Sequence, residues 1–259
     1  MNYLKKSLLL LMAFGLVHTY SIAQENSTKK ELGELYFVSE TFVEPENHEV
    51  FIEYNKAYKK LADEQKGPEY YVMNANGSYR FSGSFGKEIS GLGDFYKKWG
   101  DWNAKPDVKK LNEKYGYTES YYNTVIWRHA PELSYSKGES TADVAFNYRR
   151  YTEYYIKSDK VNEFKEIIKG YIAEYTKLGV EVKITSLWNV MGREAPCLMV
   201  VDDYKDEEDW VMSVKEYTEK TKENEQLKEL SKRFYNTLRK TEQYEGYYMK
   251  DLSHSNEDN

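Results

Sequence analysis

The stretch "YFVSETFVEPENHEVFIEYNKAY", residues 36–58, decides the fold, because a similar stretch, "RRYTEYYIKSDKVNEFKEIIKGY", follows at residues 149–171. The two align without a gap at an offset of 113 residues. Five aligned positions keep the same kind of residue: Glu40 and Glu153, Phe42 and Tyr155, Phe51 and Phe164, Glu53 and Glu166, Tyr58 and Tyr171. In each copy a run rich in β-branched and aromatic residues precedes apolar residues at three- and four-residue spacing. This order predicts a strand followed by an amphipathic helix.

The rest of the chain repeats in the same way, with a Tyr-Asn-Thr triplet at residues 122–124 and again at residues 235–237. In the first half we predict strands at 35–43, 69–75, 79–85 and 132–136, and helices at 47–66, 89–99 and 107–127. In the second half we predict strands at 145–156, 180–189, 197–202 and 245–251, and helices at 159–178, 206–220 and 224–241. The shared order of elements indicates an internal duplication.

The order strand, helix, strand, strand, helix, strand is the ferredoxin-like plan. Two such units in one chain resemble the dimeric α+β barrel superfamily, over nearly all of residues 35–252. The resemblance rests on element order and repetition, since no diagnostic motif is present. It implies an α+β fold in which two fused ferredoxin-like repeats pack their antiparallel sheets into a barrel. Members include cofactor-independent and haem-degrading monooxygenases, haem peroxidases, chlorite dismutases, isomerases and proteins without known activity, so the resemblance leaves the function open.

The first residues have the order of a secretory signal peptide: Lys5 and Lys6, an apolar run over residues 8–17, and small residues up to Ala23. The apolar run has about ten residues, whereas a membrane-spanning helix needs about 20. We therefore expect an exported protein, periplasmic or extracellular, with no membrane anchor in the mature chain. The predicted segments are a signal peptide at 1–23, a polar linker at 24–34, the first repeat at 35–137, the second repeat at 145–252 and a flexible tail at 253–259.

Composition excludes several classes of partner. The formal net charge is −6, and removal of the two lysines in residues 1–23 makes the mature chain more acidic still. An acidic chain without a basic run is not expected to bind nucleic acid or an anionic membrane. Cys197 is the single cysteine, so no intramolecular disulfide can form. The 26 Tyr and 5 Trp residues supply rings for a core or for the walls of a pocket.

No motif points to a metal or a cofactor. The predicted mature chain contains His48, His129 and His254, and no two of them have the spacing that builds a transition-metal site. His129 is the one residue suited to bind haem iron, but its predicted place near a helix end has a simpler explanation in the helix dipole. Phosphate-binding loops and nucleophile elbows are absent from the sequence. We expect no metal and no cofactor.

The recurring glutamates are the catalytic candidates. Strand alternation places Glu40 on one face of the first strand, and Glu153 on the corresponding face of the second copy. If both faces point into the barrel, the two carboxylates face each other, and repulsion would favour holding a proton on one of them. Glu40 or Glu153 could then act as a general acid or base, with Arg80 or Arg149 neutralising the other. The alternative interpretation is a structural ion pair or a solvent-facing glutamate.

We therefore predict that the chain binds a small, partly apolar or aromatic molecule in a barrel cavity. The residues expected to contact the ligand are Arg80, Phe81, Arg149, Tyr151, Tyr155 and Trp188. One alternative is a cofactor-independent monooxygenase or isomerase in which Glu40 or Glu153 moves a proton. Another is a structural or interaction protein whose barrel is filled by its own side chains, which a cavity of about 300 Å³ or more would argue against.

Overall fold

The computed structural model describes residues 32–75, 77–116, 118–137 and 147–256. The predicted signal peptide, residues 1–23, lies outside these ranges, so export stays a prediction. Within the described ranges, none of the helices combines the length and the apolar character needed to cross a membrane. All elements described below belong to one compact unit, Gly33–Asn259.

Both halves follow the same order of elements. The first half contains β1 Leu35–Phe42, α2 His48–Gln65, β2 Tyr71–Ala75, β3 Ser78–Ser84, α3 Gly91–Asn103, α4 Pro106–Tyr115 and β4 Tyr121–His129. The second half contains β6 Tyr148–Ile156, α5 Val161–Leu178, β7 Lys183–Met191, β8 Cys197–Tyr204, α6 Glu207–Thr221, α7 Glu225–Asn236 and β9 Leu238–Tyr248. The short elements are η1 Pro45–Asn47, η2 Pro131–Leu133, β5 Tyr135–Ser136, η4 Ser158–Lys160 and η5 Lys250–Leu252. The α+β class and the two ferredoxin-like halves are therefore confirmed.

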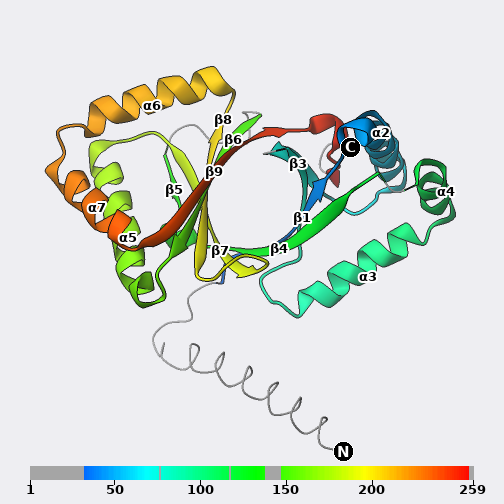
Figure 1. The fold of residues 1–259 in the computed structure, drawn as a ribbon, viewed down its shortest axis with the longest axis horizontal. Coiled ribbons are helices and arrows are strands. Elements are labelled where there is room, and N and C mark those ends of the chain that lie inside the picture. Colours follow the sequence, from blue (N-terminus) through cyan, green and yellow to red (C-terminus); the bar gives the residue numbers. More distant parts are fainter. Residues whose placement is uncertain (1–31, 76, 117, 138–146, 257–259) are drawn as a thin grey trace, which may run out of the picture. The chain divides into compact units, whose positions relative to one another are not determined.

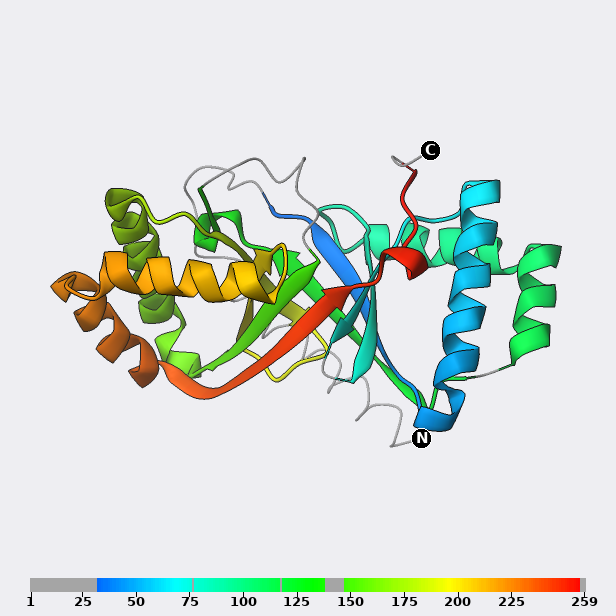
Figure 2. The ribbon, with the colours of Figure 1, turned by 90° about the horizontal axis from the view of Figure 1, so that it is seen from above.

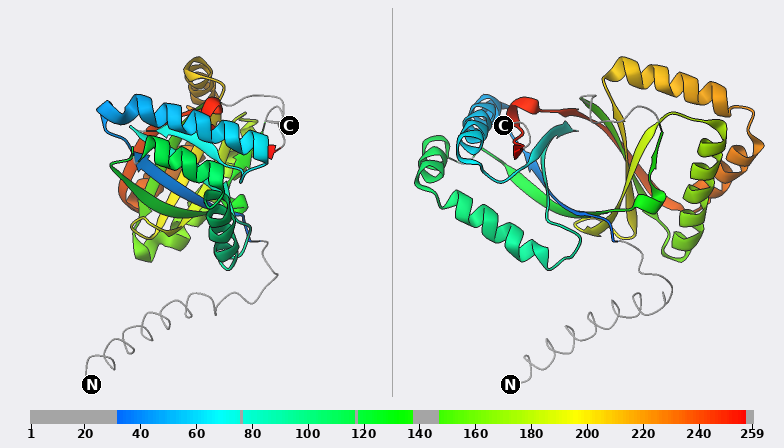
Figure 3. Two further views of the ribbon diagram at one scale, coloured as in Figure 1. Left: turned by 90° about the vertical axis from the view of Figure 1, so that its right-hand side faces the viewer. Right: turned by 180° about the vertical axis from the view of Figure 1, so that it is seen from behind.

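The strands form a closed antiparallel barrel (Figure 1). The first half has the strand order β4-β1-β3-β2 and the second half the equivalent order β9-β6-β8-β7. Two seams join the halves. At one seam β2 pairs with β9, and at the other β4 pairs with β7. The ring can be followed from behind in Figure 3, where β5 extends the sheet beside β7.

Helices cover the outside of the barrel on two opposite sides, α2, α3 and α4 on the first half and α5, α6 and α7 on the second (Figure 2). One face of each sheet meets helices and the other lines the barrel, although most residues of β9 and the first three residues of β4 are exposed. Buried apolar residues form three clusters: one under the helices of each half and one inside the barrel. The alternation of side chains along a strand decides to which cluster each residue belongs.

The predicted final helix of each half is too long. The helix expected at 107–127 is α4, which ends at Tyr115, where Gly116 takes a φ of +67°. Residues 121–129 are instead strand β4, and the strand expected at 132–136 reduces to the two residues of β5. The helix expected at 224–241 likewise ends at Asn236. In β4 the consecutive buried residues Val125, Ile126 and Trp127 interrupt the period-2 pattern of a strand. The first residues of β9 are polar and mostly exposed, so they show no strand pattern either.

The two Tyr-Asn-Thr triplets are not structurally equivalent. The first lies on β4, whereas the second lies at the junction of α7 and β9. Asn123 is the residue paired with Glu40 across the ladder, and Glu242 is the residue paired with Glu153. The counterpart of Asn123 is therefore Glu242 and not Asn236, so the matching triplets are a coincidence of spacing.

The start of the predicted flexible tail is ordered and buried. His254 is fully buried and exchanges two backbone hydrogen bonds with Tyr70, both at 2.9 Å. The Nδ1 of His254 lies 2.7 Å from Asp63 Oδ1, and Ser253 Oγ accepts a 2.8 Å hydrogen bond from the backbone N–H of Val72. The prediction of a flexible tail is wrong for these residues, because the tail continues the sheet beyond β2.

A chain that stops after Leu252 should therefore be less stable than the full chain. We expect the free energy of unfolding to fall by about 3 kcal/mol, because a buried side chain is lost and a buried N–H loses its acceptor. Urea unfolding at neutral pH measures the change. Removal of residues 257–259 alone is the control, with a change below about 0.5 kcal/mol. Equal stability of the two truncated chains would show that the docked tail contributes nothing.

Candidate functional site

The two predicted catalytic carboxylates both lie inside the barrel. Glu40 on β1 is 3% exposed and Glu153 on β6 is 1% exposed. β1 and β6 are four strands apart in the closed ring, so the two side chains approach from opposite walls. Alternation placed Glu40 and Glu153 on corresponding strand faces but left open whether those faces point inward, and in the structure both do.

Arg193 joins the two carboxylates. Its Nη2 donates to Glu40 Oε1 at 2.5 Å, and its Nε donates to Glu153 Oε2 at 3.0 Å. The Arg193 side chain is 15% exposed, so these ion pairs are largely shielded from water. The predicted repulsion between two facing, unpaired carboxylates does not arise. The geometry is that of the alternative interpretation, a buried ion pair, here shared between the halves.

Arg80 on β3 is the second cation of this network. Its Nη2 lies 2.8 Å from Glu40 Oε1, and its Nη1 donates to the hydroxyl of Tyr244 on β9. The guanidinium carbon lies 4.0 Å from the centre of the Tyr244 ring, which is a cation–π contact. The Tyr244 hydroxyl donates in turn to Glu153 Oε1 at 2.8 Å. A second chain of contacts thus connects Glu40 to Glu153.

Tyr155 extends the network towards Glu242 on β9. Its hydroxyl lies 2.8 Å from Glu153 Oε2 and 3.0 Å from Glu242 Oε2, and its single proton can serve one of these acceptors at a time. Burial raises the pKa of Tyr155 and of Tyr244, so both phenols remain protonated at neutral pH. The hydrogen bond from Lys240 is the main reason that the pKa of Glu242 is lowered.

Gly192 explains how Arg193 reaches the barrel interior. Gly192 has a φ of +94°, and a Cβ built on it would lie 2.3 Å from the carbonyl oxygen of Thr124 on β4. Any side chain at this position would push the β7–β8 connection away from β4. Arg193 was not among the predicted site residues. The available signal was an arginine directly after the glycine of a predicted hairpin.

A cavity of about 700 Å³ occupies part of the barrel interior. The barrel is therefore not completely filled by its own side chains. Arg80, Arg149 and Tyr151 were predicted to contact a ligand, and all three line this cavity. Its apolar lining residues are Val38, Met73, Trp127, Leu187, Met199 and Val201. We call this space the barrel cavity.

The other predicted ligand-binding residues lie elsewhere. Tyr155 is inside the barrel, but it is not among the residues that line the cavity. Trp188 packs on the outside of the sheet, with its ring centre 6.4 Å from that of Phe164 on α5. Phe81 also belongs to the helix-facing cluster. The prediction grouped Phe81 with Arg80, but neighbouring residues on a strand point to opposite faces, so these two cannot share a cavity.

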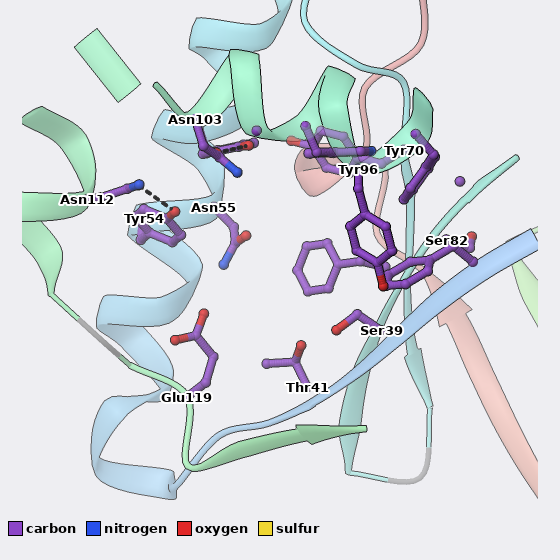
Figure 4. Close-up of a pocket in the computed structure, with 17 residues that line it drawn as sticks. Ser39, Thr41, Tyr54, Asn55, Tyr70, Ser82, Tyr96, Asn103, Asn112 and Glu119 are labelled. Carbon is purple, nitrogen blue, oxygen red and sulfur yellow. Dashed lines mark hydrogen bonds between the residues drawn. The ribbon is translucent and has the colours of Figure 1, made fainter. Parts of the chain in front are cut away.

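A second cavity, of about 630 Å³, lies between the first sheet and helices α2, α3 and α4 (Figure 4). We call it the helix–sheet pocket. Eight aromatic side chains line it: Phe37, Tyr54, Tyr58, Tyr70, Phe81, Phe95, Tyr96 and Trp99. Phe81 therefore does line a cavity, but not the predicted one. The sequence did not predict this pocket. Its wall combines residues of strands and of helices, and the apolar periodicity of a helix does not indicate which part of the sheet the helix packs against.

Polar side chains in the helix–sheet pocket gather near one end. Ser39 and Thr41 of β1, Asn55 of α2 and Glu119 surround the same space in Figure 4. Tyr54 is held by a hydrogen bond from its hydroxyl to Asn112 Oδ1 at 2.8 Å. Burial, and then the charge of Glu119, raises the pKa of Tyr54 to about 12, so its phenol is a donor at neutral pH.

In the second half side chains of α7 pack against α5 and the sheet. Leu227, Leu230 and Phe234 pack there in one cluster with Phe164 and Ile167 of α5. A Cβ built on Gly170 would lie 3.0 Å from Leu230 Cδ2, so α5 and α7 are in close contact. The two halves have the same topology but differ in how their helices pack against the sheet.

The described residues include no group of three or more His, Cys, Asp or Glu side chains that could hold a metal ion. His129 lies on β4 and not at a helix end, so the helix-dipole explanation for it is wrong. It lines neither of the two cavities. Its Nε2 lies 3.3 Å from Ser134 Oγ, and burial lowers the pKa of its imidazole.

Comparison with known proteins identifies the fold alone. No protein-family model matches the chain, and no curated protein matches it. Two solved structures described as a "putative monooxygenase" are similar. The one from Lactobacillus acidophilus has a TM-score of 0.52 and 9% identity, with 83% of this chain and 94% of that chain covered. The one from Fusobacterium nucleatum has a TM-score of 0.53 and 12% identity, with 85% and 94% covered. The chain therefore has the α+β barrel fold of these proteins.

Replacement of Arg193 by methionine should destabilise the protein by about 3 kcal/mol, because two buried carboxylates lose their shared cation. Chemical unfolding at pH 7 measures this loss. The deficit should shrink as the pH falls towards 4, since a proton taken up by the folded variant replaces the missing charge. Arg233→Met is the control. Arg233 is 47% exposed and lies 3.7 Å from Glu163, and its loss should cost less than about 0.5 kcal/mol. A pH-independent deficit in R193M would argue against buried charge as the cause.

Proposed function

We propose that the protein binds a small planar aromatic molecule that carries a hydroxyl group, and that it binds this ligand in the helix–sheet pocket. The observation that carries the proposal is the ring of eight aromatic side chains around about 630 Å³. Ligand pockets of this size with mainly apolar walls and a few convergent polar groups are typical of small-molecule sites. Aromatic walls favour flat aromatic ligands, through stacked and edge-to-face contacts.

The polar end of the pocket supports a ligand that donates hydrogen bonds. Glu119 is the one charged residue among the described residues that line the pocket. A carboxylate accepts hydrogen bonds and repels an anion, so a neutral phenol suits it better than a carboxylic acid. Ser39 and Thr41 add hydroxyls that can donate or accept. The ligand class is the one predicted from the sequence, whereas the site lies outside the barrel.

The enzyme alternative keeps a specific observation in its favour. Glu153 is hydrogen-bonded to Tyr244, and Tyr244 to Arg80, which lines the barrel cavity. This arrangement puts a buried carboxylate two side chains behind the wall of a space where a substrate could lie. Because the Arg80 guanidinium does not give up a proton, a general base at Glu153 requires that the substrate, or one bridging water, reaches Glu153 or the Tyr244 hydroxyl directly. The two similar structures described as a "putative monooxygenase" share only the fold. A cofactor-independent monooxygenase or isomerase that uses Glu40 or Glu153 is therefore our second candidate.

We also infer that the two halves arose by duplication of one ferredoxin-like unit. Two observations support this inference. The halves have equivalent strand orders, and Glu40 occupies the same position in the β1–β3 ladder as Glu153 does in the β6–β8 ladder. Related chains with a single unit that dimerise into the same barrel would strengthen the inference. Relatives whose two halves belong to unrelated sequence groups would contradict it.

Binding of 1-naphthol tests the first proposal, with naphthalene as the ligand that lacks the hydroxyl. We expect Glu119→Gln to weaken 1-naphthol binding about tenfold, because a charge-assisted hydrogen bond is lost, and to leave naphthalene binding within twofold. Ser39→Phe should abolish binding of both by filling the pocket. Ligand fluorescence gives the dissociation constants. Glu113→Gln, on the exposed side of α4, is the control and should change neither. Binding that survives Ser39→Phe would place the ligand elsewhere.

Oxygen uptake tests the second candidate. If the protein is a monooxygenase, it should consume oxygen in the presence of 1-naphthol or a related phenol. Glu153→Gln should lower the rate at least 100-fold if this carboxylate is the general base. Glu245→Gln, on the outer face of β9, is the control, since Glu245 pairs with Arg150 at 3.1 Å. A rate that is the same in Glu153→Gln and Glu245→Gln would exclude Glu153 as the base.

A further inference from the structure

Three charged residues at a partly exposed part of the barrel cavity form one ion-paired group. Arg149 Nε donates to Asp203 Oδ1 at 2.5 Å, and Lys183 Nζ lies 3.7 Å from Asp203 Oδ2. Arg149 also has a side-chain hydrogen bond with Tyr151, and Lys183 has a further interaction besides that with Asp203. Each cation is therefore already engaged by protein atoms. We call Arg149, Asp203 and Lys183 the rim group.

The rim group cannot bind a ligand ion without losing a contact of its own. The Asp203 side chain is only 5% exposed, so its carboxylate depends on its cations for compensation. An organic anion at Arg149 would have to displace Asp203 or lie beside its negative charge, and a buried carboxylate that loses its partner is strongly destabilising. An organic cation would be repelled by Arg149 and Lys183. The rim group therefore disfavours ligands of either charge.

The rim group and the buried ion network lie at two levels of the barrel. Arg149 and Glu153 are four residues apart on the inward face of β6, which is about 13 Å along a strand. Tyr151 lies between them and lines the cavity. At the inner level, Arg80 also lines the cavity, and its Nη2 lies 2.8 Å from Glu40 Oε1. A ligand in the cavity therefore meets paired charges at both levels.

Much of the remaining cavity wall is apolar or aromatic. This part of the lining consists of Val38, Met73, Trp127, Tyr151, Leu187, Met199 and Val201. The thioethers of Met73 and Met199 come from different halves of the chain, and a thioether adapts to the shape of a ligand and makes favourable contacts with aromatic rings. Burial of an apolar ligand body against these side chains is favourable. The wall therefore favours a neutral ligand that contains a ring.

We propose that the barrel cavity is a second ligand site, for a neutral, mainly apolar molecule with an aromatic ring, and that the rim group excludes organic ions of the same shape. Asp203 is the residue that determines this specificity, because its carboxylate engages the cations that an anionic ligand would otherwise bind. The site is separate from the helix–sheet pocket and does not rest on the function proposed for that pocket.

Two fluorescent probes that differ by one charged group test the selectivity: neutral N-phenyl-1-naphthylamine and anionic 8-anilinonaphthalene-1-sulfonate. The full chain should bind the amine at least tenfold more tightly than the sulfonate, because the sulfonate must compete with Asp203 for its cations. Fluorescence titration at pH 8 gives both dissociation constants. Equal or tighter binding of the sulfonate by the full chain would overturn the proposal without any variant.

Asp203→Asn should reverse the preference. It removes the carboxylate that engages Arg149 and Lys183, so sulfonate binding should strengthen at least tenfold, whereas amine binding should stay within threefold. Asp202→Asn is the matched control, because Asp202 is the preceding residue on β8 and points to the helix-facing side. Burial, and then the charge of Asp203, raises the pKa of Asp202 to about 7. At pH 8 both variants therefore remove a mostly ionised carboxylate, and an equal gain in both would contradict a role for the rim group.

Two uncharged substitutions locate the amine, and they also serve if Asp203→Asn does not fold. Leu187→Trp should remove amine binding by filling the barrel cavity, whereas Ser39→Phe, in the helix–sheet pocket, should leave that binding in place. Amine binding that is unchanged in Leu187→Trp, or that is lost in Ser39→Phe, would place the probe outside the barrel and overturn the proposal. Loss of 1-naphthol binding in Ser39→Phe reports on the other site alone, so the two proposals can fail separately.

Discussion

The shared ion pair of Arg193 with Glu40 and Glu153 is the interaction on which the rest of the barrel depends. A carboxylate left unpaired in such an interior would cost several kcal/mol, so two of them require cations within hydrogen-bond reach. Arg193 supplies one cation to both halves, because Gly192 lets the β7–β8 connection lie against β4. The same contact accompanies the β4–β7 seam. The contacts that close the barrel therefore also neutralise the two buried carboxylates. Both halves are needed, because Glu40 belongs to the first half and Glu153 and Arg193 belong to the second.

The halves share their topology but differ in how their helices pack. In the second half Leu227, Leu230 and Phe234 of α7 pack in the buried cluster beside the sheet. In the first half the helix–sheet pocket lies between the helices and the sheet, with an acidic residue at its polar end. The barrel cavity is lined by Arg80 of the first half and by Arg149, Lys183 and Asp203 of the second half. The chain thus has two cavities with different linings on one scaffold.

Much of this could be predicted from the sequence, because strand alternation and helical periodicity are local properties. The repeat at 36–58 and 149–171 predicted the fold class and placed Glu40 and Glu153 on corresponding strand faces, while the direction of those faces was left open. The prediction of a helix over 107–127 was wrong, since Val125, Ile126 and Trp127 of β4 are buried consecutively and Gly116 was not recognised as the stop. Arg193 and the helix–sheet pocket could not be predicted, because both depend on contacts between segments far apart in the chain. The prediction of a flexible tail was wrong for a similar reason, since nothing in the local sequence "SHSN" indicates that His254 packs beside Asp63.

The seam between β2 and β9 is a short ladder, and its shortness bears on how a molecule could enter the barrel cavity. The ladder between β2 and β9 has three residue pairs, from Met73 with Tyr248 to Ala75 with Gly246, whereas that between β6 and β9 has nine. Short ladders open at a lower free energy than long ones. Met73 and Tyr248 stand at this seam and also line the cavity. Tyr71 of β2 also lines the cavity and is 44% exposed, so the cavity already reaches the protein surface beside this strand. We expect the β2–β9 seam to widen this opening more readily than the long ladders within each half, because fewer hydrogen bonds have to separate.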